Sequence, residues 1–338
     1  MKKLYKILIV EVLMILACNI YGQEKTRILD LRGEWKFTIS KTENWNTSWF
    51  DDHNWEKIKV PSPWESQGFY GYDGYAFYRK NINIPSVYKN HMIYLKLGYI
   101  DDVDEVYFNG ELVGSTGSFP PKLKSAYNAK REYYIPGSLI HFDQKNVIAV
   151  KVYDAQQEGG IVSGEVGIYI VNNPVIFDID LQGKWKFKTG DNMVYKEKDY
   201  NDNNWNEIIV PSNWEDMGYR DYDGYAWYRI TFKVTKNIPS DRLVLMLGKI
   251  DDIDEAYLNG KFIGRTGYFT ENSTHANTWK DIRGYYFLKD QLDLKGNNTI
   301  AVRVRDYGAG GGIYQGPVGI ATQEKYIEYW RRKKEEKF

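Results

Sequence analysis

Cysteine and histidine are scarce in this sequence of 338 residues, which contains one cysteine and four histidines. The single cysteine, Cys18, excludes an internal disulfide framework and a cysteine-based zinc site. The sequence also lacks an excess of charge, because 45 lysines and arginines balance 45 aspartates and glutamates. Nucleic-acid binding needs a basic surface that releases counterions from phosphates, so the composition argues against a nucleic-acid partner.

Long apolar runs are absent outside the N-terminus. There Lys2, Lys3 and Lys6 precede an apolar run over residues 7–17 that is too short to span a bilayer. This pattern is typical of a signal peptide, so we predict that residues 1–22 are removed and that the protein is secreted or periplasmic. The alternative is processing before Cys18, which would make that residue a lipid anchor.

Aromatic residues and glycine are abundant. The chain has 29 Tyr, 14 Phe and 11 Trp, together 16% of its residues, and 30 Gly. With 43% hydrophobic residues the chain can bury a sizeable core, which argues against intrinsic disorder. Enrichment in tyrosine and tryptophan favours β structure.

The sequence repeats itself at an interval of 150 residues. Residues 31–37 (LRGEWKF) return as 181–187 (LQGKWKF), and 72–79 (YDGYAFYR) return as 222–229 (YDGYAWYR). Such a period is too long for a solenoid repeat and indicates tandem duplication of a whole domain. We therefore predict a signal peptide over residues 1–22, domains over 26–172 and 177–322, and a charged tail over 323–338.

Each copy has the pattern of a β protein. Asn109-Gly110 and Asn259-Gly260 separate β-prone runs and predict two-residue hairpin turns, in which both residues take a positive φ. Eight or nine short strands per copy, joined by polar, Gly-rich turns, predict an all-β chain of two tandem jelly-roll β-sandwiches. In the tail, Tyr326, Ile327 and Trp330 share a face of a predicted short helix, which we expect to pack on its own domain. A membrane or partner contact is the alternative.

Five motifs, present in this order in both copies, carry a resemblance to a known family. They are GxWxF (33–37), VPSxWE (60–65), YDGYAxYR (72–79), NGxxxG (109–114) and NxIAVxV (146–152). The set resembles the sugar-binding jelly-roll domain of glycoside hydrolase family 2, the N-terminal, galactose-binding-domain-like domain of β-galactosidases and β-glucuronidases. Residues 100–105 (IDDVDE), followed by Asn109-Gly110, are similar to a domain of sialate O-acetylesterase-like proteins. The resemblance implies carbohydrate as the ligand. Where family 2 domains tend to read GIYR, this chain has GIVS (160–163) and GIYQ (312–315), which puts the usual docking against a catalytic partner in doubt.

The catalytic parts of such enzymes are not expected in this sequence. A family 2 enzyme places two carboxylates on a (β/α)₈ barrel of about 250 residues, whereas the two copies occupy nearly the whole mature chain. No Gly-x-Ser-x-Gly motif lies between a strand and a helix, as an esterase would need. None of the four histidines recurs in the other copy; His53, for example, corresponds to Asn203. We therefore predict no catalytic residues.

An acidic pair, Asp102 and Asp104, recurs in the second copy as Asp252 and Asp254. We expect these carboxylates to accept backbone and tyrosine hydrogen bonds, or to pair with Arg79 and its repeat, Arg229. Calcium binding is the alternative, and catalysis the least favoured one. No other cofactor is expected. Trp35, Phe37, Trp55 and their repeats are predicted core residues.

The predicted ligand-binding residues lie in loops that combine rings, which stack on sugar faces, with carboxylates, which bind hydroxyls. They are Trp64, Glu65, Tyr70, Tyr72, Asp73, Tyr75 and Glu158 in the first copy, and Trp214, Glu215, Tyr219, Tyr222, Asp223, Tyr225 and Tyr314 in the second. For Trp64 and Trp214, packing at the end of the sandwich is the alternative. Residues 156–160 and 307–310 are a second candidate rim.

Three functions fit these observations. The first is a secreted, non-catalytic protein whose two copies bind an oligo- or polysaccharide with the advantage of multivalency. The second is an accessory or degenerate member of a β-galactosidase-like system, with a catalytic glycosidase or esterase chain as its partner. The third is a module that binds protein, which a large contiguous apolar patch would favour.

Overall fold

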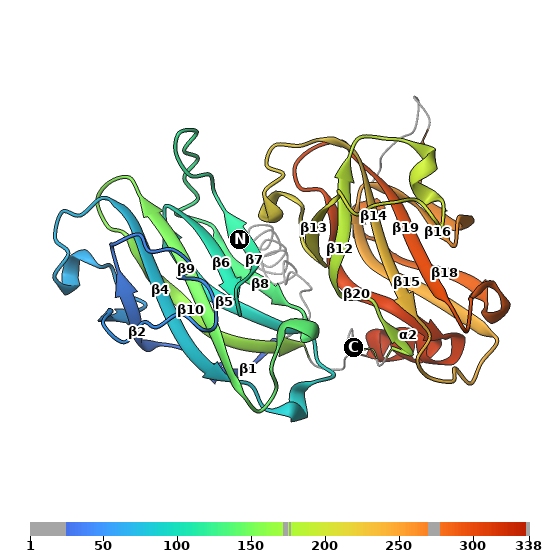
Figure 1. Cartoon of the computed structure of the whole chain (residues 1–338), viewed down its shortest axis with the longest axis horizontal. Coiled ribbons are helices and arrows are strands. Elements are labelled where there is room, and N and C mark those ends of the chain that lie inside the picture. The colour runs from blue at the N-terminus through green and yellow to red at the C-terminus, as the bar shows by residue number, and fades with distance from the viewer. Residues whose placement is uncertain (1–24, 172–174, 176, 270–277, 336–338) are drawn as a thin grey trace, which may run out of the picture.

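The computed structural model describes residues 25–171, 175, 177–269 and 278–335. The predicted signal peptide, Cys18 and the link between the copies at 172–174 lie outside these residues. Figure 1 shows two β-sandwiches side by side, with one helix below the second.

Residues 25–171 form the first sandwich, from an antiparallel sheet of four strands and one of six. The four-stranded sheet has the order β1-β10-β5-β8 and the six-stranded sheet the order β3-β2-β4-β9-β6-β7. The strands are β1 (Lys25–Asp30), β2 (Gly33–Thr38), β3 (Glu56–Val60), β4 (Gly74–Asn83), β5 (Ile93–Asp101), β6 (Val103–Phe108), β7 (Glu111–Thr116), β8 (Lys130–Ile135), β9 (Lys145–Asp154) and β10 (Gly160–Val171).

The second sandwich has the same strand order, β11-β20-β15-β18 against β13-β12-β14-β19-β16-β17. Its strands are β11 (Ile179–Asp180), β12 (Gly183–Thr189), β13 (Asn206–Val210), β14 (Gly224–Lys233), β15 (Arg242–Asp251), β16 (Ile253–Leu258), β17 (Lys261–Thr266), β18 (Ile282–Leu288), β19 (Asn297–Asp306) and β20 (Gly312–Thr322), followed by helix α2 (Gln323–Glu335). The prediction of an all-β chain of two jelly-roll sandwiches with a C-terminal helix is confirmed. Each sandwich has ten strands, more than the eight or nine expected.

Short 3₁₀ turns connect several strands. They are η1 (Glu65–Gln67), η2 (Ser86–Tyr88), η3 (Gly137–Leu139), η4 (Met193–Lys196), η5 (Glu215–Met217), η6 (Thr278–Lys280) and η7 (Lys289–Gln291). The predicted Asn-Gly hairpins are also present. Phe108 pairs with Glu111 across a turn in which Asn109 has φ 51° and Gly110 has φ 94°. Asn259 and Gly260 form the equivalent turn.

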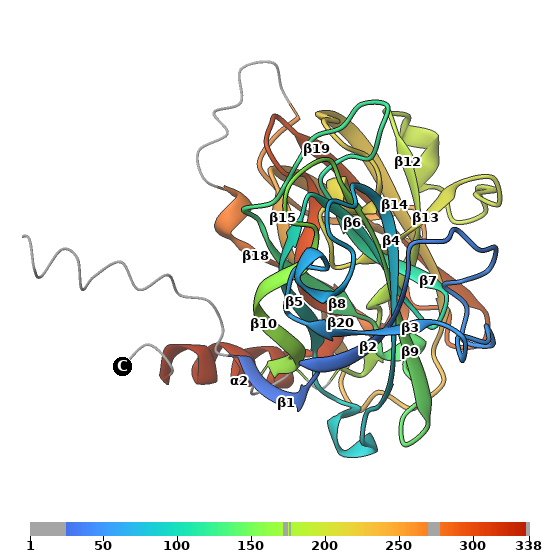
Figure 2. The ribbon, with the colours of Figure 1, turned by 90° about the vertical axis from the view of Figure 1, so that its left-hand side faces the viewer.

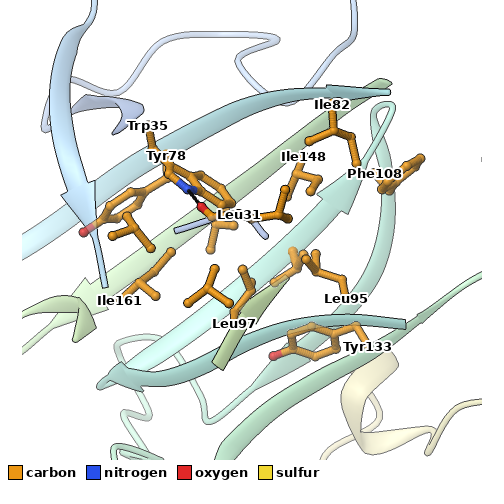
Figure 3. Packing of buried hydrophobic residues seen from close by; sticks show 14 of the residues in the cluster. Leu31, Trp35, Tyr78, Ile82, Leu95, Leu97, Phe108, Tyr133, Ile148 and Ile161 are labelled. Carbon is orange, nitrogen blue, oxygen red and sulfur yellow. Dashed lines mark hydrogen bonds between the residues drawn. The ribbon is translucent and has the colours of Figure 1, made fainter. Parts of the chain in front are cut away.

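The core of each copy lies between its two sheets. Figure 3 shows Trp35, Leu95, Phe108 and Ile148 converging from both sheets of the first copy. The Trp35 indole donates a hydrogen bond to the Leu31 carbonyl over 2.8 Å, so its only polar group is satisfied within the core. Trp35, Phe37 and their repeats are buried as predicted, whereas Trp55 is half-buried.

Two kinds of buried arginine stabilise each sandwich, and neither makes the predicted pair. Asp104 accepts from Arg131 Nε at 2.7 Å and from the Tyr133 hydroxyl at 2.5 Å, and all three side chains are buried. Arg79 pairs instead with Asp52 at 2.7 Å. The second copy repeats both arrangements, with Arg283 on Asp254 and Arg229 on Asp202. The prediction that Arg79 and Arg229 pair with the acidic motif is therefore wrong.

Helix α2 packs on the second sandwich through a face different from the predicted one. In Figures 1 and 2 it lies at the lower edge of that sandwich. Tyr329 is buried against Val244 and Met246, and Tyr326 packs beside it, whereas Ile327 and Trp330 are exposed. Within the part of the chain that the structure describes, no helix is long and apolar enough to cross a membrane.

The two copies contact each other through different parts of their surfaces. Turn η5 of the second copy lies against β7 of the first. Ser115 Oγ donates to the Asp216 carbonyl over 3.0 Å and accepts from Arg220 Nη2 over 2.9 Å. An apolar cluster of Met92, Tyr134, Val171 and Ile209 adjoins this contact.

Candidate functional site

The two tryptophans among the predicted ligand-binding residues are framework residues. Trp64 and Trp214 are fully buried, and each indole donates to a backbone carbonyl, of Tyr72 or Tyr222, over 3.1 Å. A ring without exposed surface cannot stack on a sugar. Their prediction as ligand-binding residues is therefore wrong, and the packing alternative is correct.

Glu65 and Glu215 hold the loop that follows β9 or β19. Both carboxylate oxygens of Glu65 accept from the Gly159 amide, at 3.1 and 3.0 Å. Glu215 does the same with the Gly311 amide, at 3.2 and 3.0 Å. Burial raises the pKa of Glu215 to about 7. These contacts give both glutamates an internal role at the end of the sandwich.

Three predicted tyrosines also use their hydroxyls internally. The Tyr72 hydroxyl donates to the Tyr75 carbonyl over 2.9 Å, and Tyr222 makes the equivalent bond to the Tyr225 carbonyl. The Tyr219 hydroxyl accepts from Asn206 Nδ2 over 2.6 Å, and its ring lies edge-on to Phe187. All three are half-buried supports of the loops.

Tyr75 and Tyr225 occupy equivalent half-buried positions in β4 and β14. The Tyr75 ring stacks on Phe119 with centroids 6.0 Å apart, and Tyr225 stacks on Phe269 at 5.9 Å. The Tyr225 hydroxyl accepts from Arg305 Nη1 over 3.1 Å. Their rings are therefore already paired.

Four predicted residues are exposed and free to meet a ligand. Tyr70 is 93% exposed, and Asp73, Glu158 and Asp223 are also exposed. Tyr70 lies just after η1, the first-copy equivalent of the turn that docks between the copies. Its counterpart at the offset of 150 is Arg220, which is half-buried in the contact with Ser115.

An acidic cluster lies at the same end of each sandwich. Asp101, Asp102 and Asp154 place carboxylate oxygens within 4.8 Å of one another, and Asp251, Asp252 and Asp306 do the same. Asp104, which the calcium alternative included, is instead occupied by Arg131. That part of the prediction is wrong because the alternation along β6 turns Asp104 into the sandwich.

Burial shifts the titration of these clusters. It raises the pKa of Asp101 and of Asp154 to about 7, and neighbouring carboxylates add to the effect. In the second copy the pKa of Asp251 rises to about 8 and that of Asp306 to about 6, again mainly through burial. Asp154 and Asp306 were missed from the sequence, although each ends a matched strand.

A cleft of about 250 Å³ lies where the two copies meet. Tyrosine rings and carboxylates from both copies, two side-chain amides from the second copy and a lysine from the first surround it. Its lining residues are Lys25, Tyr94, Val113, Glu132, Tyr133, Tyr134, Pro211, Ser212, Asn213, Asp216, Tyr314 and Gln315. Tyr314 is a predicted ligand-binding residue, and the structure assigns it to this cleft rather than to the exposed rim of the second copy.

Several side chains that line the cleft have shifted pKa values, among them Asp216 and Tyr314. Burial raises the pKa of Asp216 to about 6, although Asn213 Nδ2 donates to its carboxylate over 3.3 Å. Burial raises the pKa of Tyr314 to about 12, and its hydroxyl donates to the Trp279 carbonyl over 2.7 Å. Buried polar groups that converge on a concave surface are typical of ligand sites.

Comparison with known proteins gives partial matches. No protein-family model matches the sequence. Over 67 residues, or 18% of the chain, it is 42% identical to a β-galactosidase of Vibrio vulnificus, of which the match covers 6%. The structure is similar to that of a Bacteroides uniformis β-glucuronidase, with 17% identity, a TM-score of 0.37, and coverage of 86% of this chain and 28% of that one. It is also similar to the structure of a glycosyl hydrolase family 2 member from Bacteroides cellulosilyticus, with 13% identity and a TM-score of 0.36. That match covers 82% of this chain and 31% of the other. The chain thus spans less than a third of the length of these proteins.

Proposed function

We propose that this protein is a secreted, non-catalytic carbohydrate-binding protein and that it binds a sugar residue in the cleft between its two copies. The observation that carries the proposal is the composition of this cleft, which combines two half-buried tyrosine rings, those of Tyr94 and Tyr314, with two carboxylates and two side-chain amides. Sugars present apolar C–H faces to rings and hydroxyls to amides and carboxylates. Both kinds of partner are therefore within reach of one ligand.

The size of the cleft indicates how much of a glycan it accepts. Its volume of about 250 Å³ lies just below the range of about 300–1,000 Å³ that is usual for small-molecule sites. A single sugar residue, such as the end of a chain, suits this space better than an extended polysaccharide.

The local match to a β-galactosidase supports carbohydrate as the ligand class. It also favours the second candidate function, an accessory role beside a catalytic glycosidase. That role predicts that adding this protein raises the rate at which a β-galactosidase cleaves a polymeric substrate, with no change on a soluble model substrate.

Native affinity electrophoresis against a panel of polysaccharides tests the proposed function. We expect one or more glycans to retard the protein, and Tyr314→Ala to weaken the retardation at least about tenfold because it removes a ring from the cleft. Tyr286→Ala, at an exposed tyrosine on β18, is the matched control and should behave like the unaltered chain. Incubation of the protein with these glycans should produce no new reducing ends, because we propose that it does not hydrolyse them.

Two outcomes would contradict the proposal. Retardation that survives Tyr314→Ala but disappears in Tyr70→Ala would move the site to the rim of the first copy. An absence of retardation by every glycan would argue against autonomous carbohydrate binding.

A further inference from the structure

We propose that each copy binds one calcium ion, held by Asp101, Asp102 and Asp154 in the first copy and by Asp251, Asp252 and Asp306 in the second. The inference is independent of glycan binding and concerns a different part of the molecule from the cleft. Two separate observations carry it, the spacing of the carboxylates and an unsatisfied buried oxygen.

The spacing of the carboxylates suits calcium. Each residue contributes one oxygen, and the three oxygens lie within 4.8 Å of one another. Calcium bonds to oxygen at about 2.3–2.6 Å, so oxygens on opposite sides of one ion lie up to roughly 5 Å apart. The three carboxylates can therefore reach a common ion without a change in the fold.

An oxygen at the base of each cluster has no partner. Asp154 is 0% exposed; its Oδ1 accepts from the Gln156 amide over 3.2 Å, whereas its Oδ2 is buried and without a hydrogen bond. Asp306 Oδ2 is in the same state, while its Oδ1 accepts from the Gly308 amide. An unsatisfied buried carboxylate oxygen is costly, and a cation bound to it would remove that cost.

Within the residues that the structure describes, no basic side chain forms an ion pair with Asp101, Asp102 or Asp154. Arg131 opposes the rise in the pKa of Asp101 electrostatically, but its Nε donates to Asp104 and its other nitrogens donate only to backbone carbonyls. Two further carboxylates, of Glu65 and Asp73, act electrostatically on Asp154. The local charge is therefore strongly negative and calls for a cation.

The two clusters keep both their carboxylates and the backbone amides that bind them. Asp102 accepts from the Ala155 amide over 3.0 Å, and Asp252 accepts from the equivalent amide of Tyr307 over 3.1 Å. The three acidic positions and the backbone amides that bind them thus recur together in both copies. Because every side-chain ligand is an oxygen, a hard cation is expected, and a set of three carboxylates favours calcium over magnesium, which retains most of its water.

Calcium titration of the EDTA-treated chain by calorimetry tests the proposal. We expect two ions per chain with dissociation constants between about 10⁻⁶ and 10⁻³ M. Asp154→Asn and Asp306→Asn should each leave one ion, and the double variant none. Asp290→Asn, at an exposed aspartate in η7, is the matched control and should bind two ions.

Two further measurements guard against a folding defect in the variants. Asp101→Asn changes the half-buried member of the first cluster and leaves its buried base intact, so this variant should also lose one ion. On the unaltered chain, saturating calcium should raise Tm by about 5 °C and displace Tb³⁺, detected by its luminescence. The proposal is overturned if 5 mM calcium produces neither heat nor a Tm shift, if magnesium binds more tightly, or if the double variant still binds two ions.

Discussion

Two glycines show how closely the residues at the end of each sandwich are packed. A Cβ atom on Gly159 would overlap the Trp64 ring, and one on Gly311 would overlap Trp214. Neither glycine has a positive φ, so space and not backbone conformation excludes a side chain there. The Trp-Glu pair of the VPSxWE motif therefore holds the loop that contains Gly159 or Gly311. The tryptophan ring packs against this glycine, and the glutamate carboxylate accepts a hydrogen bond from its amide.

The variant Gly159→Ala should destabilise the protein by about 1–3 kcal/mol, because the new methyl group must displace the Trp64 ring. Gly137→Ala is the matched control, since its Cβ would meet no atom within 4 Å. Urea denaturation followed by tryptophan fluorescence measures both. Equal unfolding free energies for the two variants would contradict this account of the loop.

At the scale of elements, local patterns predicted strands and turns but not which distant side chains meet. The Asn-Gly hairpins follow from two adjacent residues and are present. The acidic site joins Asp101 and Asp102, at the turn between β5 and β6, to Asp154 at the end of β9, and this long-range convergence could not be inferred from spacing. For the same reason the sequence did not predict the residues of the cleft between the two copies, apart from Tyr314, because this cleft forms only when both copies are in contact.

The predicted face of α2 was wrong because two stripes were available in the same helix. Tyr326 with Trp330 and Tyr326 with Tyr329 both fit a period of 3.6 residues, and the structure uses the second pair. The variant Tyr329→Ala should therefore cost about 2–4 kcal/mol of unfolding free energy, because Tyr329 is 5% exposed. Ile327→Ala, at a residue that is 39% exposed, should cost less than about 1 kcal/mol. A larger loss for Ile327→Ala in thermal or urea unfolding would reverse the assignment of the buried face.

At the scale of the whole molecule, the contact between the copies contains a titratable group. Asp216 lies in η5 at this contact, where burial raises its pKa from the ordinary 3.8 to about 6; Asp104 adds to the rise, and Arg220 and Asn213 oppose it. Between these two values the folded protein retains a proton that the unfolded chain has lost. The ionisation of Asp216 therefore lowers the free energy of unfolding as the pH rises from about 4 to 6. Above about pH 6 the free energy of unfolding falls no further through this group.

The variant Asp216→Asn removes this ionisation and keeps the shape of the side chain. We expect its Tm to exceed that of the unaltered chain at pH 7.5, by an amount that corresponds to at most about 3 kcal/mol, and to match it near pH 4. Asp290→Asn, at an exposed position, should leave the pH profile unchanged. A stability difference for Asp216→Asn that is the same at both pH values would show that the titration of Asp216 does not matter.

The contact between the copies is head-to-tail, since η5 of one meets β7 of the other, and a heterologous contact of this type can in principle propagate into a fibre. The two residues bonded in this contact are not repeated at the free ends of the tandem pair. On the unused η1 end of the first copy, Tyr70 stands where the second copy has Arg220, and on the unused β17 end of the second copy, Arg265 stands where the first has Ser115. A neighbouring molecule would thus bring Tyr70 opposite Arg265 in place of the bond between Arg220 and Ser115, so the contact inside the chain is not reproduced between two chains.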